Sequence, residues 1–217
     1  MAGKKKSYRQ FCGMARALDR VGERWTLTIV RNLLLGPRRY KDLLDELPGI
    51  TTNLLAKRLK EMAAAGLVER TLSAAPLRTP VYSLTPLGAA LEPVIMELGR
   101  WGTRFLAEPV GGDTVNIGWA LLSLKRRYRG GLARSVGFRI GERSFELVFE
   151  RAYLGVLERE PTRSELVVSG SLEAFQRWLF RGVPAADLRA AGELQVCGDE
   201  AVFEEVDGAF APLRLTG

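Results

Sequence analysis

The stretch GITTNLLAKRLKEMAAAGLVER, residues 49–70, decides the fold of the first half of this chain. Leu55, Leu59 and Met62 recur at spacings of four and three, so they share one side of a helix with 3.6 residues per turn. Thr51 is a suitable N-cap, because its hydroxyl can accept a free backbone N–H of the first turn. The pattern predicts an amphipathic helix that ends before Gly66 and leads into a strand.

The polar side of this helix has an unusual composition. Asn53, Lys57 and Lys60 follow the same spacing and lie opposite the apolar stripe. A solvated helix face usually mixes both signs of charge, whereas this sector holds one amide and two lysines. Such a face is suited to a negatively charged partner.

Charge is unevenly distributed along the 217 residues. Residues 1–109 hold 18 basic against 10 acidic side chains, a net charge of +8, and residues 110–217 hold 14 against 15, a net charge of −1. The segment EPVGGDT, residues 108–114, has the composition of a linker. We therefore predict two domains, 1–109 and 110–217, of which the first meets a polyanion.

Composition excludes several classes of protein. No apolar run approaches the roughly 18 residues of a membrane span, and the start MAGKKKSYRQFCG lacks the hydrophobic region of a secretory signal. Cys12 and Cys197 stand far apart without a CxxC motif. The sequence predicts a reduced, cytoplasmic protein.

Histidine is absent, which removes Ser–His–Asp and Cys–His nucleophile pairs and His-ligated zinc. Neither a GxxxxGK[ST] nor a GxGxxG loop is present. We expect no enzyme activity, no metal and no cofactor. An enzyme that uses a cavity in the second half is a rival hypothesis, but no paired catalytic groups support it.

The order of predicted elements in the first half is four helices, a hairpin and a further helix. Two short helices joined by a tight glycine turn, the second polar on its outer side, make a helix-turn-helix. The expected helices span 11–22, 23–36, 39–49 and 51–65, the strands span 67–73 and 80–85, and a long helix starts at Thr85–Pro86. In the second helix, Trp25, Ile29 and Leu33 form the inner stripe.

Several linked motifs resemble a known family. The segments G-E-R-W-T-L, L-L-x-G-P-R-R-Y, L-P-G-I, R-L-K-E-M, G-L-V-E-R and L-T-P-L-G are similar to those of the HxlR-type winged helix-turn-helix regulators of bacteria, relatives of the MarR group. The resemblance covers roughly residues 8–107. It departs at Pro80–Val81, where the family often has an acidic residue before the tyrosine.

The resemblance implies that residues 51–65 enter the major groove of double-stranded DNA and that the 72–80 hairpin is the wing. Short polar or cationic side chains at the start of such a helix read base edges. The candidate base-reading residues are Thr51, Thr52, Asn53 and Lys57. The candidate phosphate contacts are Arg38, Arg39, Lys41, Lys60 and Arg78, and Arg58, also a candidate DNA contact, lies beside the apolar stripe and could instead pack or pair within the protein.

The last helix of the first half carries an apolar seam. Its residues alternate spacings of four and three, a pattern that favours helix pairing or coverage of the domain's own core. Pro93 should bend the helix. The family resemblance favours a homodimer formed through terminal helices, and a dimer predicts a pseudo-palindromic operator. The candidate interface residues are Leu91, Val94, Leu98, Trp101 and Phe105, in a seam that begins at Leu87.

The second half predicts an α+β domain. A helix is expected over 115–128, period-two strands follow from 135 with a turn at 141–143, and ELVVSG-SLEAFQRWL-x₄-PAADLRAAGELQVCGD indicates strand, helix capped by Ser171, short helix and strand. This order resembles the latter part of a sterol-carrier-type lipid-binding domain over residues 113–215. The fold class is thus α+β, a winged helix-turn-helix domain followed by an α+β domain with a small, mainly antiparallel sheet.

The sterol-carrier resemblance implies an apolar cavity and a hydrophobic or acyl effector. The alternative is a dry core, which aromatic residues at strand or helix spacing usually form. The candidate lining residues are Phe138, Phe145, Phe149, Phe175, Trp178, Leu179 and Phe203.

Cys12 offers a different switch. Lys6, Arg9 and Arg16 lie near it in sequence, and cations favour the thiolate. Regulators of the resembled family have a cysteine near this place that senses oxidants or electrophiles, so the resemblance implies redox sensing; a structural cysteine is the alternative.

The main hypothesis is a dimeric, cytoplasmic transcriptional regulator, expected to be a repressor, with no membrane partner. The rival from another class is a lipid carrier or peripheral membrane protein whose basic half binds anionic lipid.

Overall fold

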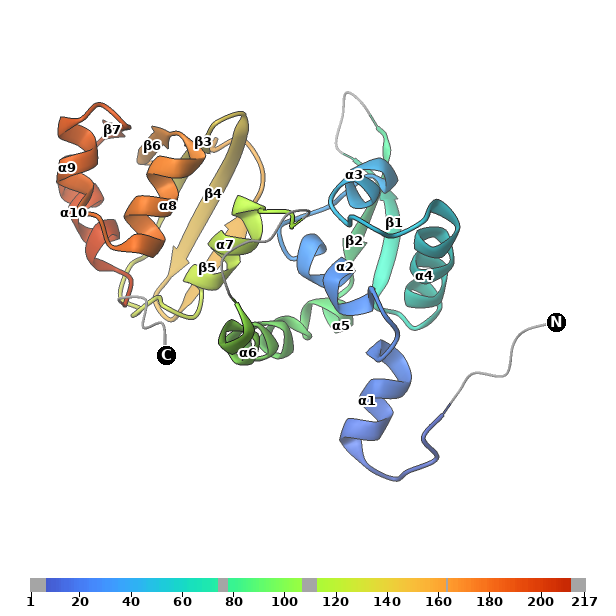
Figure 1. Cartoon of the computed structure of the whole chain (residues 1–217). Helices are drawn as coiled ribbons and strands as arrows, with labels where there is room; N and C mark the ends of the chain where they lie inside the picture. Colours follow the sequence, from blue (N-terminus) through green and yellow to red (C-terminus); the bar gives the residue numbers. More distant parts are fainter. Residues whose placement is uncertain (1–6, 74–77, 107–112, 163, 212–217) are drawn as a thin grey trace. The chain divides into compact units, whose positions relative to one another are not determined.

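The computed structural model describes residues 7–73, 78–106, 113–162 and 164–211. The chain divides into two compact units, Met1–Ile95 and Met96–Gly217 (Figure 1). Most of the predicted linker, 107–112, lies outside the described residues. No helix in the described part of the chain is long and apolar enough to span a bilayer.

The first unit has the predicted order of elements, four helices followed by a hairpin. The helices and strands are α1 (Gly13–Val21), α2 (Thr26–Leu33), α3 (Tyr40–Asp45), α4 (Thr52–Ala64), β1 (Val68–Leu72), β2 (Pro80–Leu84) and α5 (Pro86–Ala89). In Figure 1, α1 projects away from the group formed by α2, α3, α4 and the hairpin.

Turn chemistry sets the ends of α4. Gly49 has φ +88° in the turn before the helix, and Gly66 has φ +72° just after it, a region of backbone conformation that favours glycine. The Thr51 hydroxyl accepts a hydrogen bond from the Leu54 amide at 3.3 Å, which confirms the predicted N-cap.

The core of this unit lies between α2, α3, α4 and the hairpin. Ile29, Leu43, Leu55 and Leu59 are buried in one cluster with Val68 at the start of β1. The strands β1 and β2 pair antiparallel, with Val68 opposite Leu84 and Leu72 opposite Pro80. The hairpin therefore packs against the helix-turn-helix through its base, and its tip, 74–77, lies outside the described residues.

The second helix begins later than predicted. Trp25 precedes α2 with φ +79°, a left-handed conformation that a helix interior does not allow. The Trp25 ring, half-buried, packs on the same core as Ile29 and Leu33, so its apolar role was predicted correctly and its place on the helix was wrong.

The predicted long helix after Thr85 is two helices, and this prediction was wrong. The first, α5, ends at Ala89; the second, α6, spans Glu92–Gly102 and continues into a 3₁₀ turn, η1, at Thr103–Phe105. The chain turns at residues 90–91, before Pro93, and Pro93 sits in the first turn of α6, where the missing N–H costs no helical hydrogen bond.

The second unit is a five-stranded sheet with helices, as expected. Its elements are α7 (Ile117–Leu124), β3 (Arg134–Ile140), β4 (Arg143–Glu150), β5 (Tyr153–Leu157), β6 (Leu166–Gly170), α8 (Leu172–Arg181), α9 (Ala185–Ala190), β7 (Leu194–Gly198) and α10 (Glu200–Gly208). The strand order is β5-β4-β3-β6-β7. Only the β3–β6 pair is parallel among the pairs that the structure describes, which confirms the mainly antiparallel prediction.

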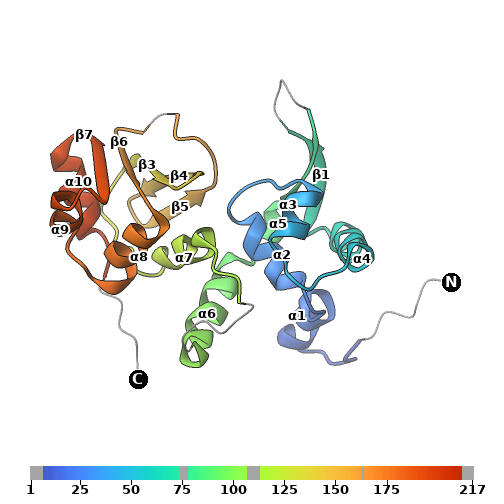
Figure 2. The same cartoon turned by 45° about the horizontal axis from the view of Figure 1, so that its top comes forward.

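Alternation along the strands sends one set of side chains into the core between the sheet and its helices. Phe138, Leu147 and Val168 are buried there, and Phe175 and Trp178 of α8 meet them. Figure 2 shows α7 and α8 together on one side of the sheet. Ser171 caps α8 through the Ala174 amide at 3.1 Å, as predicted.

Candidate nucleic-acid interface

The helix α4 separates its residues into a buried face and an exposed face. Leu55, Leu59 and Met62 are at most 2% exposed. Burying each such side chain contributes about 1.5–3 kcal/mol, so the orientation of the helix is strongly determined. The exposed face carries Thr52, Asn53, Lys57 and Lys60, with the exposed N-cap Thr51 beside them. The predicted polar sector is therefore present as one outward surface.

The neighbouring helix α3 holds the start of α4 in place. The Tyr40 hydroxyl donates a hydrogen bond to the backbone carbonyl oxygen of Thr52 at 2.6 Å. This contact fixes the first turn of α4, where the candidate base-reading residues begin. Tyr40 was not among the residues predicted from the sequence; its position directly after two arginines and at the start of the helix-turn-helix was the available signal.

Arg39 and Asp42 close the start of α3. The Asp42 carboxylate accepts hydrogen bonds from the Arg39 backbone amide at 3.0 Å and from the Arg39 Nη2 at 2.7 Å. The Arg39 hydrogen bond lowers the pKa of Asp42 and, in return, the Asp42 hydrogen bond raises the pKa of Arg39. The Arg39 side chain is still largely exposed, as is Lys41 on the same helix, so both stay accessible to a phosphate.

Arg38 differs from these exposed cations because it is buried. Its Nη1 donates to the carbonyl of Pro37 at 3.3 Å, and its Nε lies 3.6 Å from the Glu46 carboxylate. Its backbone exchanges hydrogen bonds with Tyr82, which joins the loop before α3 to strand β2. The structure thus places Arg38 inside the domain, unlike the exposed candidates for phosphate contact.

Arg58 is also buried, at 5% exposure. Its Nη1 lies 2.6 Å from a Glu61 carboxylate oxygen, and its Nη2 lies 3.1 Å from Glu23. Of the two alternatives for Arg58, the structure favours pairing within the protein. Its position beside the apolar stripe was the sequence signal for this outcome.

The wing contributes one described candidate, Arg78. It is exposed, has φ +41°, and lies two residues before strand β2. Ser73 and Thr79 hold the two sides together, since the Ser73 amide donates to the Thr79 carbonyl at 2.8 Å and the Thr79 amide donates to the Ser73 hydroxyl at 3.0 Å. Backbone and side-chain hydrogen bonds therefore join the two sides of the hairpin at Ser73 and Thr79.

The apolar seam of the last helix is mostly exposed. Leu91 is partly buried against the core of the first unit, together with Ile95. The other four candidates, on α6 and η1, are between 47% and 68% exposed. Among them, the rings of Trp101 and Phe105 meet edge to face, with 4.9 Å between their centroids. These four are Val94, Leu98, Trp101 and Phe105. Of the two hypotheses for this seam, the exposure favours an interface over coverage of the domain's own core.

Cys12 is exposed and occupies the N-cap position of α1. Backbone amides of Ala15 and Met14 lower the pKa of its thiol, because they stabilise the thiolate at the positive end of the helix. The sequence analysis attributed a thiolate preference to nearby cations, whereas the structure supplies helix amides. Cys197 is an exposed free cysteine on β7.

The seven candidate lining residues of the second unit are all buried and pack closely. Phe138 lies 5.1 Å from Phe175 and 5.6 Å from Trp178, and Trp178 stacks on Phe203 at 5.7 Å between ring centroids. The Trp178 indole N–H donates to Asp207 of α10 at 2.6 Å. The helix α10, which the sequence analysis did not predict, thus completes this aromatic cluster.

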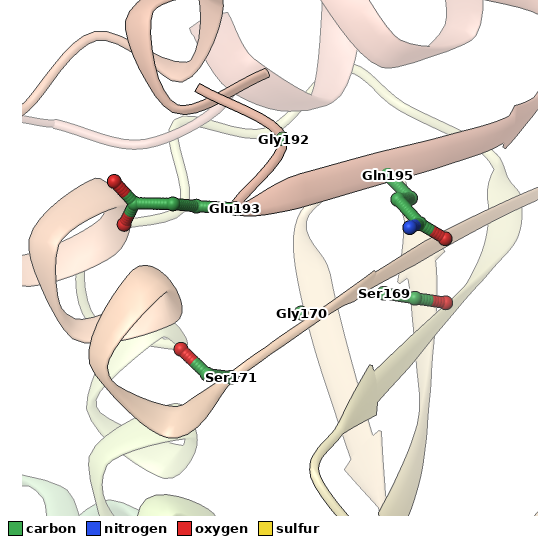
Figure 3. A pocket seen from close by; sticks show the side chains of 6 residues that line it. All are labelled: Ser169, Gly170, Ser171, Gly192, Glu193 and Gln195. Carbon is green, nitrogen blue, oxygen red and sulfur yellow. The ribbon is translucent and has the colours of Figure 1, made fainter. Parts of the chain in front are cut away.

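A recess in this unit is lined by other residues. Figure 3 shows it between the end of β6, the start of α8 and the start of β7. Its lining is polar or glycine and includes none of the seven aromatic and apolar candidates. The lining residues are Ser169, Gly170, Ser171, Gly192, Glu193 and Gln195. No group of metal-ligating side chains occurs among the residues that the structure describes.

The comparison with known proteins agrees with the geometry of the first unit. The family model described as HxlR-like helix-turn-helix matches residues 20–109. The HTH-type transcriptional regulator YodB of Bacillus subtilis is 39% identical over 103 residues, which are 47% of this chain and 88% of YodB. The chain belongs to the HxlR-like helix-turn-helix family.

Two further proteins are similar over nearly the same part of the chain. The uncharacterized HTH-type transcriptional regulator YvaP of Bacillus subtilis is 36% identical over 92 residues, covering 42% of this chain and 84% of YvaP. A solved structure of the redox regulator HypR in its reduced form is 28% identical, with a TM-score of 0.40, and covers 43% of this chain and 92% of HypR. The family match ends at residue 109 and so does not include the five-stranded sheet.

Proposed function

We propose that this HxlR-family chain regulates transcription by binding a pseudo-palindromic operator as a homodimer, with α4 in the major groove. The observation that carries the proposal is the division of α4 into a fully buried apolar face and an exposed face of Thr52, Asn53, Lys57 and Lys60. Asparagine can make a bidentate contact with adenine, and lysine can contact guanine or phosphate. The relatives are named as transcriptional regulators, which favours a regulator over an enzyme.

The contacts with the DNA backbone come from the exposed cations around α4. Arg39 at the N-cap of α3, Lys41 on α3, Lys60 on α4 and Arg78 on the wing are all exposed. Phosphate contacts position a reading helix without specifying sequence. The buried Arg38 and Arg58 are left out of this set, since exposing either would separate it from the acidic partners described above.

Dimerisation supplies the two-fold symmetry of the operator. Val94, Leu98 and Trp101 form an exposed apolar surface on α6 that costs free energy in water. Two copies that bury these side chains would present two α4 helices to half-sites about one helical turn apart.

A genomic selection tests this function. Fragmented bacterial DNA is bound to the full chain, recovered and sequenced, and the best site is mapped by hydroxyl-radical footprinting. The expected result is an enriched inverted repeat whose two protected half-sites are centred about 10 base pairs apart or a multiple of it. Enrichment of no sequence over random DNA would contradict the proposal and would favour the lipid-carrier hypothesis, which predicts binding to anionic vesicles without DNA sequence preference.

Cys12 supports a second candidate function, thiol redox sensing through the same DNA-binding domain. The thiol is exposed at a helix N-cap, and helix amides lower its pKa, the two properties of a reactive cysteine. Diamide should release wild-type protein from its operator and should not release Cys12→Ser. Cys197→Ser is the matched control and should behave as wild type; equal release of Cys12→Ser would reject the sensor.

The second unit remains the proposed effector domain. The family match ends at residue 109 and gives the sterol-carrier resemblance no support, and the close ring contacts around Trp178 favour the alternative of a packed core. A hydrophobic effector must bind the DNA-competent and incompetent states with different affinity. Thermal shift with a panel of fatty acids and sterols tests it: a ligand that raises Tm and changes operator affinity supports the effector, and a panel without effect rejects it.

A further inference from the structure

The guanidinium of Arg58 lies between two carboxylates from different parts of the fold. Glu61 follows it by one turn on α4, with 2.6 Å from its Oε2 to Arg58 Nη1. Glu23 is 35 residues away in sequence, with 3.1 Å from its Oε2 to Arg58 Nη2. The Arg58 side chain is 7% exposed, whereas that of Glu23 is 66% exposed. A surface carboxylate therefore reaches inward to hold a buried cation on the recognition helix.

Glu23 belongs to a short corner, residues 22–25, that joins α1 to α2. The same corner touches the approach to α4 a second time, because the Trp25 ring lies against Gly49, 3.9 Å from the point where a Cβ would stand. Gly49 is two residues before the N-cap Thr51. The corner thus contacts the recognition helix in its middle, through Arg58, and the turn that leads into it, through Trp25.

This arrangement suits orientation better than contact with DNA. The planar guanidinium makes directional hydrogen bonds, so its pairing with Glu23, which lies outside α4, restricts rotation of α4 about its own axis. Withdrawing Arg58 to meet a phosphate would leave its site in the domain without the charge that the two glutamates face. Only Glu61 is on α4 itself; Glu23 alone links the helix to the rest of the domain through this cation.

We infer that Arg58 is a positioning residue, which through Glu23 fixes the recognition helix against the α1–α2 corner and so sets the angle at which Asn53 and Lys57 meet the bases. The inference rests on the proposed DNA-binding function. It assigns to the acidic Glu23, on the domain that binds a polyanion, a role that favours DNA binding. That role has an unusual consequence for the sign of a charge mutation.

Removing a negative charge from a DNA-binding surface ordinarily strengthens DNA binding, because repulsion of the phosphates is lost. The positioning role predicts the opposite for Glu23→Gln. Loss of the Glu23–Arg58 pair allows α4 to sample angles that do not fit the groove, and we expect operator affinity to fall about tenfold. Asp45→Asn is the matched control, an exposed acid on α3 of the same domain, and its operator affinity should be unchanged or slightly higher.

The experiment is a double-mutant cycle with Glu23→Gln, Arg58→Gln and the double variant, measured by fluorescence anisotropy on the selected operator between 50 and 300 mM salt. Each variant is measured well below its own Tm, so that a loss of fold is excluded. The expected result is that both single variants weaken binding to a similar extent, that the double variant is no weaker than either, and that the salt slope is unchanged. Tighter or unchanged binding by Glu23→Gln, or a salt slope reduced by about 0.9 in Arg58→Gln as for a lost phosphate contact, would overturn the inference.

A second readout needs no DNA and separates this inference from the proposed function. Hydrogen exchange in the free protein should accelerate at the amides of residues 55–61 in Glu23→Gln and remain at the wild-type rate in Asp45→Asn. Unchanged exchange at these amides would overturn the positioning role of the Glu23–Arg58 pair even if the operator is bound. Absence of any preferred operator for wild type, with accelerated exchange in Glu23→Gln, would reject DNA reading and would still support the positioning of α4 by the Glu23–Arg58 pair.

Discussion

The Tyr40 hydroxyl donates a hydrogen bond to the backbone carbonyl of Thr52 at 2.6 Å, and it thereby joins the first helix of the helix-turn-helix to the first turn of the second. The carbonyl of Thr52 belongs to the same turn that exposes Asn53. The polar face of α4 is thus positioned at its start by Tyr40 and in its middle by Arg58.

Replacing Tyr40 by Phe should lower both stability and operator affinity. The change removes one hydrogen bond and keeps the half-buried ring, so the free energy of unfolding should fall by about 0.5–1.5 kcal/mol. Operator affinity should fall severalfold, because the first turn of α4 loses a fixed point. Tyr153→Phe, which removes an exposed hydroxyl from the second unit, is the control. Thermal unfolding and anisotropy measure the two effects; a Tyr40→Phe protein equal to wild type in both would show that the hydrogen bond has no positioning role.

The exposed seam on α6 predicts a dimer that a single charge can break. Trp101→Glu places a carboxylate in the centre of the proposed interface, where burying an unpaired charge is costly. Sedimentation velocity at micromolar concentration should show a dimer for wild type and a monomer for the variant. Since Trp101 is 56% exposed, the fold should persist, which circular dichroism checks. A wild-type monomer would refute the interface.

The Arg39–Asp42 pair predicts a stability difference that depends on pH. Hydrogen bonds from Arg39 hold the pKa of Asp42 below its ordinary value. Its contribution is therefore present above the unfolded-state pKa of about 3.9 and is lost as pH falls through the lower, folded-state pKa. The Tm of wild type should exceed that of Asp42→Asn by a small, constant margin from pH 7 to 5, and the margin should close in more acidic solution. Scanning calorimetry measures it, and a margin that widens with acidity would contradict the sign.

Cys12 should react as a thiolate at lower pH than an ordinary cysteine. The amides of Ala15 and Met14 lower its pKa, so the rate of alkylation by iodoacetamide should rise with a midpoint below the ordinary thiol value of about 8.5. The measurement uses Cys197→Ser protein, in which Cys12 is the remaining thiol. A midpoint at or above the ordinary value would show that the helix N-terminus does not activate it.

Local patterns predicted the helix-turn-helix in detail. Its signals each join residues within about one helical turn, so the sequence shows them directly. They are the spacing of Leu55, Leu59 and Met62, the cap at Thr51 and the glycines around α4. The order and pairing of the hairpin strands followed from the same kind of signal. In the second unit, the Ser171 cap and the period-two strands were predicted from local patterns in the same way.

Features that depend on distant partners were less predictable. Arg58 lies beside the apolar stripe, but its pairing with Glu23 spans 35 residues and has no local signature. The bend in the last helix was predicted at Pro93, whereas the chain turns at residues 90–91. Proline is unfavourable inside a helix and harmless in its first turn, where Pro93 lies. Trp25 was placed on α2 because its spacing from Ile29 fits a helix, while its left-handed backbone depends on the corner it closes.

The salt dependence of operator binding tests the central claim, that the exposed face of α4 reads DNA. Anisotropy on the selected operator and on a scrambled duplex is measured from 50 to 300 mM salt for wild type, for Asn53→Ala with Lys57→Ala, and for the control Arg181→Ala on α8 of the second unit. We expect wild type and the control to prefer the operator by about 10³ or more at every salt concentration, and the double variant to lose that preference. Equal affinity of wild type for both duplexes, or a double variant that keeps its preference, would contradict the claim.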